Sequence, residues 1–128
     1  MAKIAVVGAG GVGGYIAAAL ARSGHWVALI ARNRHLGAIT RTGLRIESAN
    51  GTFEARPTIV TDKPEEVGTV DGVILAVKTW QVADAALSLR PLLGPGTRVL
   101  ALQNGVEVFQ QLDTILGLGY TLMGCAGY

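Results

Sequence analysis

The chain has 128 residues, of which 50% are hydrophobic and 16% charged, and its formal net charge is +2. This length suits one domain, and the apolar content excludes an intrinsically disordered chain. The small positive excess forms no dense basic stripe, which argues against a nucleic-acid partner. No apolar run is long enough to cross a membrane, so we expect no membrane association.

The content of cysteine and histidine argues against a metal centre. Cys125 is the only cysteine, and His25 and His35 have no metal-ligand spacing to other residues. A single thiol without a disulfide partner fits a reducing compartment. We therefore predict a cytoplasmic protein without a bound metal.

Strand-like runs alternate with helical segments along most of the chain. Short β-branched or apolar runs predict strands, and segments with helical spacing that end at glycine or before proline predict helices. An Asn-Gly pair at 50–51 predicts a hairpin between 44–46 and 52–54. The predicted strands are 3–7, 26–31, 58–60, 73–77, 98–102 and 120–124, and the predicted helices are 15–22, 32–41, 80–89 and 107–116, with a helical turn at 64–67.

This alternation predicts an α/β domain of the Rossmann type that covers residues 1–128. Strands that are joined through helices pair in parallel, and helices then cover both faces of a doubly wound, mainly parallel sheet. Ligands of such sheets bind beyond the carboxyl ends of the strands. The polar residues that follow the predicted strands are therefore the candidate site residues.

A glycine-rich segment follows the first predicted strand. Its residues match the G-x-G-x-x-G pattern and lead into a predicted helix, which is the context that gives this pattern meaning. Gly8 permits the tight turn, Gly10 lets the backbone approach a pyrophosphate, and Gly13 lets the helix pack on the strand. Free N–H groups at the helix start then face the phosphates. The predicted cofactor-binding segment is Gly8, Ala9, Gly10, Gly11, Val12 and Gly13.

The end of the second predicted strand selects between the two nicotinamide cofactors. An NAD-binding domain usually places a carboxylate there to accept from the ribose 2′-hydroxyl, whereas this chain has Arg32. A guanidinium can grip a 2′-phosphate through paired charge-assisted hydrogen bonds, so we predict NADPH. Arg34 either assists Arg32 or is a solvated charge on a helix face.

Two later segments place polar residues after predicted strands. Lys78 follows the run 73–77, and its ammonium is expected to project toward the nicotinamide end of the cofactor. Asn104 follows the run 98–102 and could orient a hydroxyl through its amide. Exposure of Lys78 as a plain surface charge, and a simple turn at Asn104-Gly105, remain open alternatives.

With these motifs in this order and spacing, the chain resembles the ketopantoate reductase (2-dehydropantoate 2-reductase) family. The match covers Lys3 to about Gly124 and includes the glycine motif, Arg32, Lys78 in Lys-Thr-Trp-Gln-Val and Asn104 in Gln-Asn-Gly. The resemblance implies NADPH-dependent reduction of a small 2-ketoacid to a 2-hydroxy acid, which in the best-known member belongs to pantothenate biosynthesis. It also implies that Lys78 and Asn104 contact cofactor and substrate, and that Gln81 lies near the cofactor.

The resemblance also implies that part of the catalytic machinery is missing. The second, helical domain of this family supplies the catalytic lysine and a substrate-binding glutamate, and no residue of this chain matches them. We therefore assign no catalytic residue here and expect the chain alone to bind NADPH with little or no turnover. The alternative is a stand-alone NADP(H)-binding or sensor module without catalysis. A homo-oligomer that buries an apolar surface around 106–118 is a further expectation.

Overall fold

The computed structural model describes residues 2–8, 11–31, 37, 43–48, 51–78, 81–102, 112, 114 and 121–123. Six strands form one parallel sheet in the order β5-β2-β1-β6-β7-β8. Without the separate hairpin β3–β4, this order is the 3-2-1-4-5-6 order of a Rossmann sheet. The predicted doubly wound parallel fold is thus confirmed. The sheet strands are β1 (Lys3–Val7), β2 (Trp26–Ile30), β5 (Ile59–Thr61), β6 (Gly72–Leu75), β7 (Arg98–Ala101) and β8 (Thr121–Met123).

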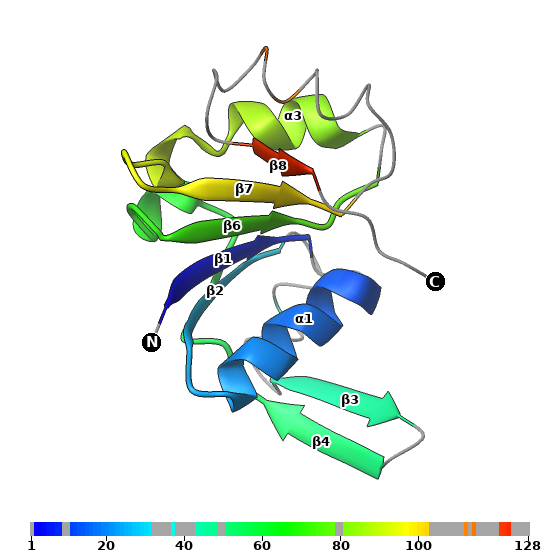
Figure 1. Cartoon of the computed structure of the whole chain (residues 1–128). Coiled ribbons are helices and arrows are strands. Elements are labelled where there is room, and N and C mark those ends of the chain that lie inside the picture. Colours follow the sequence, from blue (N-terminus) through cyan, green and yellow to red (C-terminus); the bar gives the residue numbers. More distant parts are fainter. Residues whose placement is uncertain are drawn as a thin grey trace.

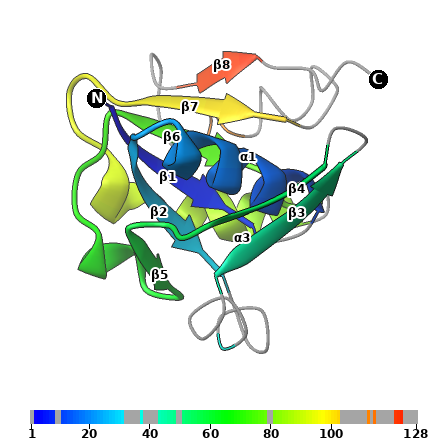
Figure 2. The same ribbon diagram turned by 90° about the horizontal axis from the view of Figure 1, so that it is seen from below.

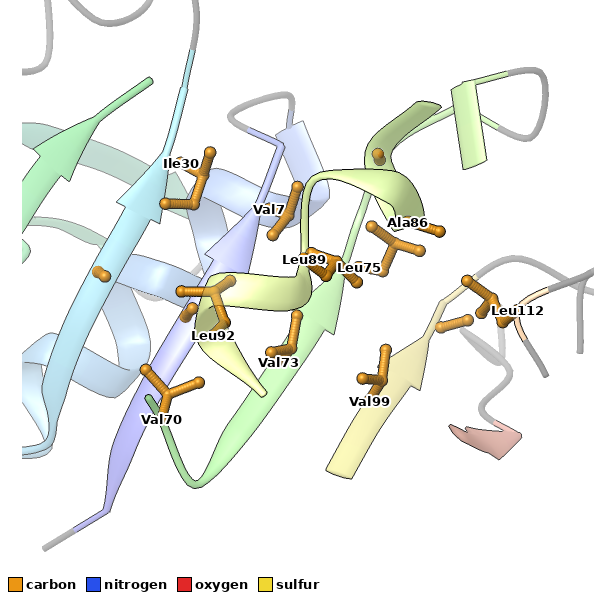
Figure 3. Close-up of a cluster of buried hydrophobic side chains, with 14 of the residues drawn as sticks. Val7, Ile30, Val70, Val73, Leu75, Ala86, Leu89, Leu92, Val99 and Leu112 are labelled. Atoms are coloured by element: carbon orange, nitrogen blue, oxygen red, sulfur yellow. The ribbon is translucent and has the colours of Figure 1, made fainter. Parts of the chain in front are cut away.

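Buried side chains cover both faces of the sheet, because neighbouring residues of a strand point to opposite sides. In β1, Ala5 and Val7 belong to one apolar cluster and Val6 to the other. Helix α1 (Gly11–Arg22) and the hairpin lie on the Val6 side, and α3 (Val82–Leu87) lies on the opposite side (Figure 1). Figure 3 shows Leu89 and Leu92, which follow α3, over Val73 and Leu75 of β6.

The hairpin β3 (Leu44–Ser48) and β4 (Gly51–Ala55) forms a two-stranded sheet of its own. It lies against α1 on the side of the helix away from the main sheet (Figures 1 and 2). The guanidinium carbon of Arg22 lies 4.6 Å from the centre of the Phe53 ring, and Leu44 joins the same buried cluster as the α1 alanines. The predicted hairpin is confirmed, and α1 is held between two sheets.

Side chains tie the amino ends of the strands to neighbouring backbone groups. The N–H of Lys3 donates to the Asp71 carboxylate at 2.9 Å, and the N–H of Ala2 donates to His25 Nδ1 at 3.2 Å. The buried Thr97 hydroxyl accepts from the Gly94 N–H at 2.8 Å and donates to the Val70 carbonyl at 2.6 Å. This edge of the sheet is therefore fastened by side chains as well as by the strand ladder.

Several element bounds differ from the prediction. Helix α1 begins at Gly11, four residues before the predicted start, because close packing of Gly13 outweighs the low helix propensity of glycine. Strand β6 spans Gly72–Leu75 rather than 73–77, and α3 spans Val82–Leu87 rather than 80–89. Two 3₁₀ turns are described, η1 (Pro64–Glu66) before β6 and η3 (Arg90–Leu92) after α3. Of the predicted helices 32–41 and 107–116, only Gly37, Leu112 and Thr114 lie within the described residues, all helical.

Among the described helices, none has the length and apolar character needed to cross a membrane.

Candidate dinucleotide-binding site

The glycine-rich segment starts where the strand order reverses direction, between β1 and β6. Gly8 has a φ of +110°, a conformation that favours glycine. A Cβ on Gly8 would lie only 2.6 Å from the Ala76 carbonyl oxygen, which follows β6. The chain turn after β1 therefore requires glycine for two reasons, conformation and space, as the motif predicts for its first glycine.

Gly13 places α1 directly against the glycine turn. It is buried, and a Cβ there would overlap the Gly8 carbonyl oxygen and approach the Ala76 Cβ at 3.1 Å. Only a residue without a side chain allows the first turn of the helix to come this close to β1 and β6. The role predicted for the third glycine of the motif is thus confirmed by the packing.

The first turn of α1 suits an anion. It contains Gly11, Val12, Gly13 and Gly14 and therefore no carboxylate, and the Val12 side chain is 43% exposed. The first N–H groups of a helix have no partner within the helix, and its dipole places partial positive charge there. A phosphate is the ligand that this combination favours.

Lys78 lies farther from its strand than the sequence suggests. Strand β6 ends at Leu75, and the Ala76 N–H still donates to the Val7 carbonyl at 2.9 Å, after which the chain bends. The prediction that Lys78 directly follows the strand is therefore wrong, because Ala76 and Val77 intervene and Ala76 packs on the glycine turn. The Lys78 side chain is exposed at the carboxyl edge of the sheet.

Gln81 is half-buried and hydrogen-bonds to Lys78 in both directions. The Lys78 N–H donates to Gln81 Oε1 at 3.0 Å, and the Gln81 N–H donates to the Lys78 carbonyl at 2.8 Å. Both backbone polar groups of Lys78 are thus held by one residue. The predicted site residues Lys78 and Gln81 lie together on the same edge as the glycine turn.

The backbone that follows β2 is described as far as Ala31, one residue before Arg32, which is predicted to bind the 2′-phosphate. Ala31 is buried, and its N–H donates to the Thr61 carbonyl at 3.0 Å, so the chain continues alongside β5 beyond the last residue of β2. The Thr61 hydroxyl is bonded to the Glu66 carboxylate and accepts from the Lys63 N–H at 3.1 Å. Arg32 itself, with Ala9, Gly10, Arg34 and Asn104, lies outside the described residues.

Sequence reasoning missed one contributor to this site, Ala76. Its carbonyl oxygen and Cβ define the space that Gly8 and Gly13 must leave empty. An alanine after a predicted strand gives no signal of this kind, because the contact is formed only when two distant segments meet. The described residues hold no group of three or more histidine, cysteine, aspartate or glutamate side chains that could bind a metal ion.

The strand order, the glycine turn and the carboxylate-free start of α1 define a dinucleotide-binding domain of the Rossmann type. The family model of ketopantoate reductase PanE/ApbA matches residues 4–127, and the chain belongs to this family. The family consists of NAD(P)-dependent reductases. The resemblance inferred from the sequence is thus confirmed.

Relatives and solved structures agree with this assignment. The chain is 42% identical, over 105 residues, to a 2-dehydropantoate 2-reductase of Mesorhizobium japonicum, with 81% of this chain and 32% of that protein covered. It superimposes with a TM-score of 0.89 and 40% identity on a 2-dehydropantoate 2-reductase of Porphyromonas gingivalis, over 97% of this chain and 46% of that one. It also superimposes with a TM-score of 0.82 and 28% identity on a D-mandelate dehydrogenase bound to NADH and anilino(oxo)acetate, over 98% of this chain and 43% of that one.

The chain spans about a third of the length of the curated relatives it matches first, with shares of 32%, 36% and 35%.

Proposed function

We propose that this chain binds NADPH at the carboxyl edge of its sheet and forms the cofactor-binding part of a 2-ketoacid reductase. One observation carries the proposal. Gly8 and Gly13, packed against each other and against Ala76, bring the carboxylate-free start of α1 to the point between β1 and β6 where the strand order reverses. Dinucleotides bind to Rossmann sheets at this point, with the pyrophosphate at the helix start.

The preference for NADPH rests on Arg32. The described backbone runs alongside Thr61 as far as Ala31, the residue that precedes Arg32 in the sequence. The 2′-carbon of the adenosine ribose is the position that residues at the end of the second strand recognise. The Rossmann fold by itself does not decide the cofactor, since the similar D-mandelate dehydrogenase is described with NADH. The choice therefore depends on the arginine in place of a carboxylate.

Lys78 and Asn104 are proposed to serve the reacting end of the cofactor. Bound NADPH supplies a hydride for the keto carbon of the substrate. Lys78 lies two residues beyond Ala76, which contacts the glycine turn, so its exposed ammonium can reach an anionic group bound at this edge. Asn104 follows β7, the neighbour of β6, and stays a candidate from the sequence alone.

The whole reductase activity needs more than this site. Hydride donor, keto carbon and proton source must share one pocket, and the resemblance places the proton donor in the helical domain of the family. The small 2-ketoacid substrate, with ketopantoate as the first candidate, is therefore proposed for the whole protein. A role in pantothenate biosynthesis, a cytoplasmic location and association between copies of the chain stay predictions from the sequence.

Parallel titrations with NADPH and NADH test the proposal. The unaltered chain is expected to bind NADPH more tightly than NADH. Arg32→Ala should weaken NADPH binding about 10- to 100-fold, because charge-assisted hydrogen bonds to the 2′-phosphate are lost. NADH binding should change little, since NADH has no 2′-phosphate. Arg98→Ala is the matched control, because Arg98 begins β7 at the opposite edge of the sheet. Equal affinities for the two cofactors would contradict the NADPH preference, and no binding of either would refute the proposed function.

A further inference from the structure

One of the two hydrogen bonds between Lys78 and Gln81 uses the amide oxygen of the Gln81 side chain, and the other uses the Gln81 backbone N–H. Within a glutamine side chain, only the amide oxygen can accept a hydrogen bond from a backbone N–H, since the amide nitrogen is a donor. The 3.0 Å bond from the Lys78 N–H therefore fixes which way the Gln81 amide points. Its oxygen accepts from the Lys78 N–H, and its NH₂ group is the part of the side chain that can donate to another partner.

The same pair of bonds fixes the backbone of Lys78. The Lys78 N–H and carbonyl are both bonded to Gln81, and the paired arrangement resembles the reciprocal bonds of a helix capping box. With both backbone groups held, the direction of the Lys78 Cα–Cβ bond is set. Without Gln81 Oε1, the exposed N–H would turn to water, and the lysine could leave its orientation at little cost.

Neighbouring contacts place Lys78 between the glycine turn and the start of α3. Ala76 is tied to β1 through the Val7 carbonyl, and it borders the space around Gly8 and Gly13. On the other side, Gln81 leads into α3, where the next residue, Val82, is buried in the core. Lys78 thus lies between two residues in fixed positions, Ala76 on the sheet and Gln81 at the start of α3.

We infer that Gln81 is a positioning residue that aims the Lys78 ammonium at the bound cofactor, and that its amide oxygen acts through Lys78 rather than on the cofactor. This inference rests on the proposed function, because the orientation of the Lys78 side chain matters only if an anionic dinucleotide binds at this edge. Gln81 would thus orient a residue that contacts the cofactor, which is a different role from contacting the cofactor itself. The residue type alone does not distinguish these two roles.

A double-mutant cycle on the whole chain tests the inference. Gln81→Met removes the acceptor and keeps the side-chain length, and Lys78→Met removes the charge. NADPH binding is titrated for the unaltered chain, both single variants and the double variant, and unfolding in urea is followed for each. We expect Gln81→Met to weaken NADPH binding about 3- to 10-fold in the unaltered background, the effect of one hydrogen bond, and to have no further effect once Lys78 is methionine.

Hydrogen exchange of the Lys78 amide supplies the second readout. Gln81→Met should speed this exchange, whereas Gln81→Glu keeps an acceptor oxygen and should leave it slow. Leu87→Ala, on the exposed side of α3, is the control that should change neither exchange nor NADPH binding.

The outcomes separate the inference from the function on which it rests. Equal losses from Gln81→Met with and without Lys78 would overturn the inference, because they would place Gln81 on the cofactor itself or in the fold alone. The same holds if the Lys78 amide exchanges equally fast in the unaltered chain and in Gln81→Met. Failure of the unaltered chain to bind NADPH would instead refute the proposed function, and the inference with it.

Discussion

The carbonyl oxygen of Gly8 occupies the place that a β-carbon on Gly13 would need. The obstacle is backbone, and Gly8 itself lies against the Ala76 carbonyl, so no flexible side chain can move aside. The start of α1 and the turn after β1 are thus fitted to each other through two glycines.

Gly13→Ala is therefore expected to destabilise the chain and to disturb the proposed phosphate site together. Displacing α1 from β1 should lower the free energy of unfolding by about 1–3 kcal/mol, the range for overpacked interiors. Urea unfolding and NADPH titration measure the two effects. Gly96→Ala is the control, because a Cβ there meets nothing within 4 Å, and its stability should change by less than about 0.5 kcal/mol. Equal stability of the two variants would contradict the packing role of Gly13.

Two leucines near α3 separate core packing from surface exposure. Leu89 is fully buried over the sheet, whereas Leu87 is 66% exposed. Leu89→Ala should lower the free energy of unfolding by about 2–5 kcal/mol, because it leaves a cavity as well as losing apolar burial. Leu87→Ala should cost less than about 0.5 kcal/mol. Urea midpoints measured side by side check the difference, and similar values for the two variants would show that the described packing of this face is wrong.

The buried hydroxyl of Thr97 joins two backbone segments that no strand ladder connects. Thr97→Val keeps the shape but leaves the Gly94 N–H and the Val70 carbonyl without this partner. We expect a loss of about 1–3 kcal/mol in the free energy of unfolding, the cost of buried polar groups left unsatisfied. Thr52→Val on the exposed surface of β4 makes the same chemical change without burial and should be nearly neutral. A neutral Thr97→Val would mean that the hydroxyl bonds contribute nothing to stability.

Sequence patterns predicted the sheet and the glycine turn because each depends on local chemistry. The apolar run of β1 and the motif from Gly8 to Gly13 carry their own signal, and Gly51, with a φ of +120°, supplies the turn residue of the hairpin. The start of α1 was predicted too late, since glycines in a first turn look unfavourable for a helix until their packing is known. Such packing is a property of the assembled sheet.

The orientation of Lys78 could not be predicted for the same reason. Its distance from the strand depends on where β6 bends, and its backbone direction depends on a side-chain oxygen three residues away. Neither follows from the apolar run that precedes it. The sequence located the residue type at the correct edge, and the tertiary contacts determine how it is presented.

The side-chain bonds at the amino ends of the strands have a consequence for how this fold can diversify. Asp71, His25, Thr58 and Thr97 fasten that edge to the backbone, with the Thr58 hydroxyl accepting from the Val27 N–H at 3.0 Å. Loops at the other edge can therefore be exchanged, lengthened or given new charges while the strands keep their registers. A related natural or engineered protein could change its ligand through substitutions in those loops alone, while the hydrogen bonds at the amino ends of the strands stay the same.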